Sequence, residues 1–295
     1  MNNKKSIITI ITSIVINSLM IFLIFKKIDL ISVKHIIVNI PIERLIISGA
    51  FLLISSLFLS PFATKLIIDN FGRLSYKEVF ILKTGSLGVK FISPYKSGDL
   101  SRILYYKNTG MNYSESASTL FFEYYLKFIV PISFAFSSII YTYSKESAYY
   151  SITAFFIFII SITSFFLSKF HLKVTKKKVK SFHFNIISAF LVYSIIYLIS
   201  ISSLFYLMNN SNIRLSLFII GFSAVSLIEK LPIFITKFGV KEFSLLYVMG
   251  NTLNGNILVS AGFVLSLFDT YIPLIISSFF LNRFIKGIKG DEKNV

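Results

Sequence analysis

The chain has 295 residues, of which 55% are hydrophobic and only 15% are charged, and its mean hydropathy is +0.76. Because a soluble globular domain is about one quarter charged, this composition excludes the ordinary soluble classes and predicts an integral membrane protein. The formal net charge of +17 does not indicate nucleic-acid binding. The basic residues gather between apolar runs, where they set topology and meet anionic lipid headgroups.

Six apolar runs are long enough to cross a membrane, because a helix needs about 20 residues to span the hydrocarbon core. In chain order we predict full spans at about Ser6–Phe25, Leu45–Ala63, Ala117–Tyr143, Ala148–Ser168, Phe184–Met208 and Ile257–Leu281. Backbone polar groups in lipid must be hydrogen-bonded within their own segment, so we expect an all-α polytopic fold. No small-residue cleavage site follows the first run, which we interpret as an uncleaved span rather than a signal peptide.

Two further apolar segments are short and broken. The first, Val79–Val89, contains Lys83 and runs into the sequence KFISPYKSGDLSR at Lys90–Arg102. The second is interrupted by charges and proline, passes through Thr236–Glu242 and ends with Phe243–Met249. Broken apolar segments with proline, glycine and charge are where transporters build their binding sites. We therefore predict two re-entrant helical segments.

The basic residues predict the topology. The connection Lys169–Lys180 holds six lysines and no acid, and the positive-inside rule places it in the cytoplasm. The lysines before the first span and the basic residues after the last belong on the same side, so both termini are expected in the cytoplasm of a multi-pass cell-membrane protein. All three groups of basic residues lie in the cytoplasm if the first broken segment enters and leaves the membrane from the cytoplasmic side and the second does so from outside. The connection Lys26–Arg44, with four basic side chains, would then be external, against the bias of the rule.

The order of segments suggests an inverted repeat within one membrane domain, residues 1–295. Each half, approximately 1–143 and 144–290, reads as span, span, broken segment, span, and the two halves have opposite orientation. Inverted repeats with paired broken helices are typical of transporters, whose site lies where the breaks meet. The pattern is also compatible with a chance recurrence of two Pro-Gly-acid clusters.

The first broken segment carries candidate binding residues. Asp99 and Arg102 are three apart, so on a helix they share a face and can pair. Arginine binds phosphate in a bidentate manner, Lys96 adds a cation, and the backbone N–H groups after Gly98 can assist. The alternative is a solvated loop, entered at Pro94, in which Asp99 only caps a helix.

The second broken segment carries a matching set: Pro232, Gly239, Lys241 and Glu242. Charges inside a membrane are costly and usually face a cavity. The alternative is that the neighbouring charges, Glu229 among them, merely end a span at the interface.

Charges also occur inside the full spans. Glu123 and Lys127 are four apart and share a helix face, as a structural ion pair or as part of the same cavity. Asp269, in the middle of the last span, needs a partner or a proton. The three histidines are scattered in or near loops, where we expect them to be solvated: His35, His171 and His183. No metal spacing and no catalytic constellation is present, so we expect neither a metal, a cofactor nor an enzyme.

The motifs resemble a known family. Residues 94–102, PYKSGDLSR, resemble the P-x-R-x-G-E-x-x-R pattern of the lysylphosphatidylglycerol synthase transmembrane-region family, also called flippase-like; Lys96 replaces arginine and Asp99 replaces glutamate. Leu231-Pro232 followed by Phe238–Glu242 resembles its second signature, and Phe122-Glu123 resembles its acidic position. The resemblance implies an integral membrane protein that moves amphiphilic lipids between leaflets. The chain resembles the stand-alone members of this family, which lack a synthase domain and several of which are tied to lipid-linked sugars and envelope polysaccharides.

We therefore predict a non-enzymatic translocase of an amphiphilic lipid, either an aminoacyl-phospholipid or a lipid-linked sugar. Its headgroup would enter a polar cavity between the two broken segments. Arg102 and Lys96 would hold the phosphate, and Asp99 and Glu242 would fix these cations or meet a cationic headgroup.

Two alternatives remain at this point. One is a non-transporting scaffold or subunit of a complex for cell-envelope glycan or lipid synthesis. The other is an ion-coupled small-solute transporter, with Asp269 and Glu123 as proton or sodium sites. Expected partners are membrane lipids and, in the first alternative, a glycosyltransferase or lipid-modifying enzyme. Nucleic acid is not expected, and the sequence leaves homo-oligomer formation open.

Overall fold

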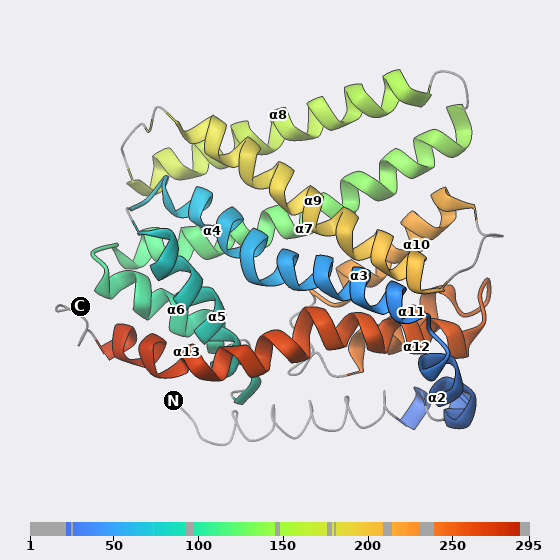
Figure 1. Ribbon diagram of the computed structural model, residues 1–295. Coiled ribbons are helices and arrows are strands. Elements are labelled where there is room, and N and C mark those ends of the chain that lie inside the picture. The colour runs from blue at the N-terminus through green and yellow to red at the C-terminus, as the bar shows by residue number, and fades with distance from the viewer. Residues whose placement is uncertain are drawn as a thin grey trace.

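A computed structural model describes residues 22–289, apart from residues 25, 73, 93–96, 145–147, 176–178, 180, 209–213 and 231–238. The described part of the chain folds into helices, without strands (Figure 1). The predicted first span, Ser6–Phe25, falls almost entirely outside the described residues.

The first half of the chain contains the helices α2 (Leu30–Val38), α3 (Ile42–Ile54), α4 (Ser60–Ile68), α5 (Tyr76–Ile92), α6 (Ser97–Asn108) and α7 (Tyr113–Ser144). The second half contains α8 (Ala148–Thr175), α9 (Phe182–Met208), α10 (Leu215–Ile228), α11 (Val240–Met249), α12 (Gly255–Ser266) and α13 (Ile272–Lys289). Two π-helices join helices end to end: η1 (Ser55–Leu59) between α3 and α4, and η3 (Leu267–Tyr271) between α12 and α13.

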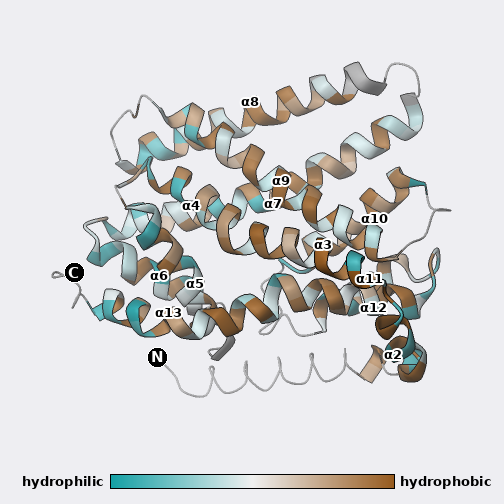
Figure 2. Ribbon diagram, viewed as in Figure 1, coloured by the Kyte–Doolittle hydropathy of each residue, from teal (hydrophilic) through white to brown (hydrophobic). Residues whose placement is uncertain are grey.

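Five described helices are long and apolar enough to cross a membrane. They are Ile42–Ile68, Tyr113–Tyr143, Phe155–Thr175, Phe182–Met208 and Gly255–Lys289. These helices coincide with five of the six predicted spans. The structure thus confirms the all-α polytopic membrane fold. Figure 2 shows hydrophobic residues along most of these helices and hydrophilic residues where α13 ends.

The two broken segments form helical hairpins. In the first, α5 packs against α6, and in the second, α10 packs against α11. Figure 1 shows the α5–α6 hairpin entering the bundle from the end where α13 terminates and the α10–α11 hairpin entering from the other end. Both predicted broken segments are therefore present as helical hairpins at opposite ends of the bundle, although α5 is longer than the predicted Val79–Val89.

The two halves exchange contacts. The first hairpin packs on α13, the last helix of the second half, whereas α10 of the second hairpin packs on α7, the last span of the first half. The α4 and α9 helices pack on each other across the centre. Gly85 allows the close approach of α5 to α13, because a Cβ atom there would collide with Phe284. This reciprocal packing is what an inverted repeat produces; the boundary between residues 143 and 144 stays a prediction.

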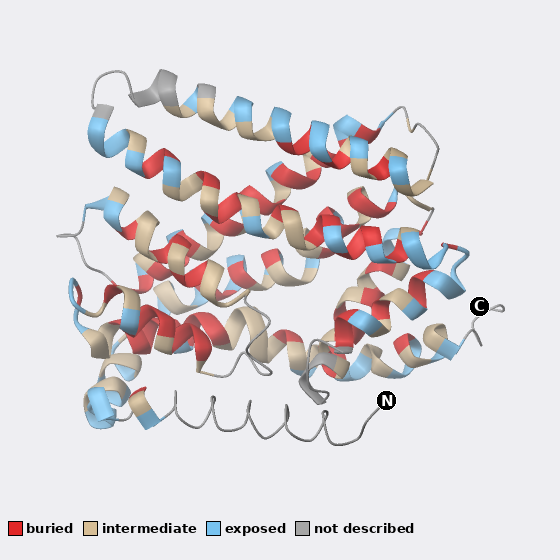
Figure 3. Cartoon of the chain, turned by 180° about the vertical axis from the view of Figure 1, so that it is seen from behind, coloured by how far each residue is buried: buried red, intermediate tan, exposed pale blue. Residues whose placement is uncertain are grey.

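Buried residues gather in the middle of the bundle, whereas most described residues of α8 on the outside are exposed or half-buried (Figure 3). The largest described core cluster includes Phe122, Phe190 and Phe218. Outward-facing side chains on α8 are also apolar, with Phe158 and Phe165 each 59% exposed. In a membrane such side chains meet lipid tails, so their exposure carries no cost.

One expectation from the sequence, a solvated His171, is wrong. The connection Lys26–Arg44 contains a helix, α2, whose N-cap is Asp29. The Ser32 hydroxyl and the Ile31 N–H donate hydrogen bonds to this carboxylate and lower the pKa of Asp29. His171 is not solvated: it is buried, and its Nε2–H donates to the backbone carbonyl of Asn70 at 2.8 Å.

Candidate functional site

A cavity of about 370 Å³ lies between the two hairpins. This volume falls within the range of small-molecule sites, about 300–1,000 Å³. The charged residues that line it are Lys83, Asp99, Arg102, Glu123, Lys127, Glu229, Lys230, Lys241 and Asp269. They come from both hairpins, from α7 and from η3. The cavity thus joins the two broken segments, where the sequence analysis expected a site.

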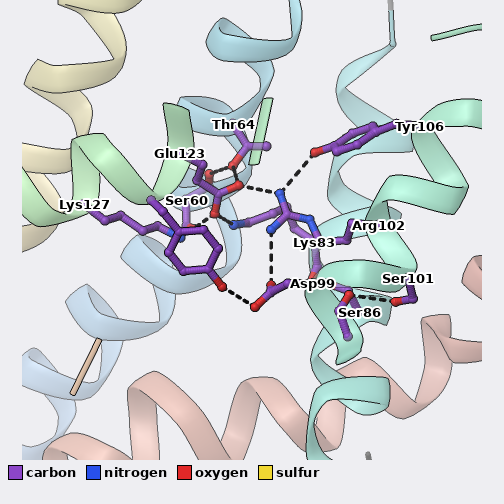
Figure 4. Close-up of polar contacts among 12 residues, drawn as sticks. Ser60, Thr64, Lys83, Ser86, Asp99, Ser101, Arg102, Tyr106, Glu123 and Lys127 are labelled. Atoms are coloured by element: carbon purple, nitrogen blue, oxygen red, sulfur yellow. Dashed lines mark hydrogen bonds and ion pairs between the residues drawn. The ribbon is translucent and has the colours of Figure 1, made fainter. Parts of the chain in front are cut away.

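Glu123 is the centre of the charged group beside the first hairpin (Figure 4). Its Oε1 atom accepts hydrogen bonds from the Nζ groups of Lys83 and Lys127. Its Oε2 atom accepts from Arg102 Nη2 and, at 3.4 Å, from the hydroxyl of Thr64. Both Glu123 and Arg102 are only 2% exposed. One buried carboxylate therefore holds three cationic side chains in place.

Asp99 is the second carboxylate of this group. Its Oδ1 atom lies 3.5 Å from Arg102 Nη1, and its Oδ2 atom accepts from the hydroxyl of Tyr124. Arg102 Nη2 also donates to Tyr106 Oη at 3.1 Å. The predicted pairs Asp99–Arg102 and Glu123–Lys127 are both present.

We call the set Lys83, Asp99, Arg102, Glu123 and Lys127 the arginine cluster. It contains three basic and two acidic side chains, which gives a formal charge of +1. Arg102 Nε is buried and has no hydrogen-bond partner within the described structure. An excess charge in a buried place is unfavourable unless a counter-charge reaches it. The arginine cluster is therefore suited to binding an anionic group.

The second group surrounds Lys241 in α11. Its Nζ atom pairs with Asp269 Oδ2 and lies 3.8 Å from Glu229 Oε1. Asp269 thus has the partner that its position in the last span requires. We call Glu229, Lys230, Lys241, Glu242 and Asp269 the lysine cluster. With three acidic and two basic side chains, its formal charge is −1 when every carboxyl group is ionised.

Local sequence explains how these side chains reach the cavity. Gly239 has φ = +73°, a left-handed conformation that favours glycine, and directly precedes α11. Pro61 follows η1 by two residues and Pro273 follows η3 by two residues. Proline lacks an N–H and clashes with the carbonyl four residues earlier, which favours the wider π-helical turn. Both π-helices border the cavity, through Ser56 of η1 and Asp269 of η3, and π-turns are frequent at functional sites.

The structure brings some predicted site residues together and leaves others off the wall. Asp99, Arg102, Glu123 and Lys241 line the cavity. Gly98 lies buried in the first turn of α6, and Gly239 and Glu242 flank Lys241 without lining the cavity. The remaining predicted residues, Pro94, Lys96 and Pro232, lie outside the described residues.

Lys83 is the main site residue that the sequence reasoning missed. It was recognised only as a charge that breaks an apolar segment, yet it contacts Glu123 and lines the cavity. The argument that an intramembrane charge needs a partner, applied to Asp269, would have found it. The four tyrosines on the wall, Tyr124, Tyr193, Tyr197 and Tyr271, carry no such signal because aromatic residues are abundant throughout the chain.

Comparison with known proteins gives one finding. A family model described as the lysylphosphatidylglycerol synthase TM region matches residues 10–277. The match contains both hairpins and all residues that line the cavity. No curated protein sequence matches the chain.

Proposed function

The chain belongs to the lysylphosphatidylglycerol synthase transmembrane-region family, and from this premise we propose that it translocates an amphiphilic lipid with an anionic headgroup between the leaflets of the cell membrane. The observation that carries the proposal is the arginine cluster, a buried group with a charge of +1 on the wall of a cavity between two hairpins. We propose transport rather than catalysis, with membrane lipids as the ligands.

The chemistry of the arginine cluster suits a phosphate group. A phosphodiester carries one negative charge and would neutralise the cluster. Arg102 presents a planar fork of donors that matches phosphate oxygens, and Lys83 and Lys127 add point charges on the same wall. The aminoacyl-phospholipids and lipid-linked sugars expected from the sequence share this phosphate, so the cluster would hold what these lipids have in common.

The lysine cluster offers different chemistry on the same cavity. Glu229 and Asp269 line the cavity. Their carboxylates can accept hydrogen bonds from sugar hydroxyls or pair with an amine. A headgroup that moves through the cavity would meet cation-rich and acid-rich walls in turn. The hairpins enter from opposite ends of the bundle (Figure 1), so each is placed to open the cavity toward one side of the membrane.

We propose that the α5–α6 hairpin enters from the cytoplasm. Its base lies at the end of the bundle where α8 and α13 terminate (Figure 1). The last turns of those helices carry Lys173, Lys286 and Lys289, and basic ends favour the cytoplasmic side.

The ion-coupled transporter alternative has less support. Glu123 and Asp269 are both engaged by cationic side chains, so binding a proton or sodium ion there would break an ion pair. A non-transporting scaffold would be expected to tolerate charge changes in the cavity and to co-purify with a glycosyltransferase or a lipid-modifying enzyme.

Translocation can be tested with the purified full chain in liposomes that contain phosphatidylglycerol and a trace of an acyl-labelled fluorescent analogue. A parallel set would carry a labelled short-chain polyprenyl phosphate. Accessibility of the label to an external quencher reports movement between leaflets. We expect the wild-type chain to move at least one probe and Arg102→Ala to lose most of this activity.

Lys107→Ala is the matched control, because Lys107 is an exposed cation of the same helix that donates toward Tyr113 at the surface and does not line the cavity of the described structure. It should behave like the wild type. A wild-type chain that moves neither probe, or an Arg102→Ala variant that moves them at the wild-type rate, would contradict the proposed function.

A further inference from the structure

Glu242 is a buried carboxyl group that the proposed headgroup site does not use. It lies in the first turn of α11 and is only 5% exposed. Neither of its carboxyl oxygens meets a donor at hydrogen-bonding geometry in the described structure, and the Ser266 hydroxyl is the nearby side-chain donor. A buried ionised carboxylate without donors is strongly unfavourable, and the neutral form avoids this penalty.

The charges around Glu242 do not compensate for it. The titratable groups that interact with it are Lys241 of its own helix, Glu229 at the end of α10 and Tyr271 of η3, and Asp269 of η3 is bound to Lys241. Lys241 is already engaged by Asp269 and Glu229. The lysine cluster thus contains three carboxyl groups, Glu229, Glu242 and Asp269, beside two lysines. A proton on Glu242 changes its formal charge from −1 to zero.

Glu123 shows what compensation looks like in the same protein. It is as deeply buried as Glu242, but its two oxygens receive Lys83, Lys127 and Arg102. An ionised Glu123 is therefore stabilised by its contacts. The difference between the two glutamates lies in their partners and not in their depth.

Glu242 also lies where its ionisation would act on the second hairpin. A Cβ atom added to Gly262 of α12 would lie 3.6 Å from both Cα and Cγ of Glu242, so this residue is part of the α11–α12 packing. Loss of its proton would place an uncompensated charge in that contact and favour separation of α11 from α12. Lys241, the next residue, lines the cavity and would move with it.

We propose that Glu242 binds and releases a proton that is coupled to the passage of the headgroup, which makes the protein a proton-coupled lipid carrier. This inference rests on the proposed function. The protonated carboxyl group allows α11 to pack on α12. When the second hairpin opens, the O–H bond breaks, the proton passes to water on that side, and the carboxylate is solvated. Protonation restores the packed hairpin.

The coupling is tested in the liposomes described above with a pH gradient imposed in either direction. The wild-type rate of lipid movement should differ severalfold between the two gradients. Glu242→Gln, a neutral residue of the same shape, should move lipid at a rate that does not respond to the gradient. Glu43→Gln is the control, since Glu43 is an exposed acid in the first turn of α3 and should keep the wild-type response.

A second measurement does not depend on transport. Infrared spectra of the purified full chain at neutral pH should show the carbonyl stretch of a protonated carboxyl group, present in Glu43→Gln and absent in Glu242→Gln. A wild-type chain without this band overturns the inference. Lipid movement that is equal in both gradients also overturns it but leaves the proposed function standing. If no lipid moves at all, the proposed function fails, and the coupling fails with it.

Discussion

Replacing Glu123 by glutamine tests whether one carboxylate stabilises the arginine cluster. The change keeps the shape of the side chain but removes the negative charge that Lys83, Lys127 and Arg102 share. Asp99 alone remains to balance three cations, so the cluster changes from +1 to +2. Removing one partner of a buried ion pair costs about 3–5 kcal/mol. We expect Glu123→Gln to lower the free energy of unfolding by an amount in this range.

The assay is thermal unfolding of the purified chain in detergent micelles, with Glu43→Gln as a neutral control at the surface of α3. In the double variant Lys83→Met/Glu123→Gln the cluster returns to +1. The double variant should therefore be more stable than the sum of the two single changes predicts, by about 0.5–3 kcal/mol.

Lipid added to the same micelles connects this stability to function. Because a ligand that binds the folded state raises its stability by mass action, phosphatidylglycerol should stabilise Glu123→Gln more than the wild type. A Glu123→Gln variant as stable as the wild type would show that the shared carboxylate does not stabilise the arginine cluster. An equal effect of phosphatidylglycerol on both chains would show that the cluster does not attract anions.

Two further predictions concern other parts of the chain. Lys241→Met removes the cation that Asp269 and Glu229 share and should lower the free energy of unfolding by about 3–5 kcal/mol. In thermal unfolding, adding Asp269→Asn to this variant should restore part of the lost stability. A further loss of stability would contradict the pairing. Hydrogen bonds from Ser32 and Ile31 lower the pKa of Asp29 below its ordinary value of 3.8, so the stabilisation of α2 is complete above pH 3.8 and is lost as the pH falls through the lower folded-state pKa. Asp29→Asn should keep the N-cap and remove this acid dependence. Hydrogen exchange of the α2 amides in the wild type and the variant, measured at each pH, tests this. Equal acid dependence in both chains would refute the assignment of the titration to Asp29.

Local rules were sufficient for the parts of the fold that depend on neighbours along the chain. Apolar run length placed the five predicted spans that lie within the described residues, and proline, glycine and charge located both hairpins. Helical spacing gave the pairs Asp99–Arg102 and Glu123–Lys127, which are three and four residues apart. Each of these features follows from the geometry of one segment, so no knowledge of packing was needed.

The long-range contacts of the site could not be read in this way. Arg102 and Lys83 reach Glu123 across 21 and 40 residues, and Lys241 reaches Asp269 across 28. These partners are chosen by how α5, α6 and α7, or α11 and η3, pack in three dimensions. The burial of His171 has the same origin, because the carbonyl group that accepts its hydrogen bond belongs to Asn70.

The two halves share a backbone plan but not a charge. Each half has a hairpin that packs on the last helix of the other half. The π-helices do not match in the same way, since η1 precedes the first hairpin and η3 follows the second. The arginine cluster nevertheless carries +1, whereas the lysine cluster carries −1 or, with a proton on Glu242, no charge. Hairpins at opposite ends of the bundle would let the cavity open at either end, but they give no direction. The unequal charges supply a difference: in the proposed carrier an anionic headgroup would be attracted to one wall, and the other wall would change its charge with a proton. Direction in such a carrier would come from these side chains and not from the fold.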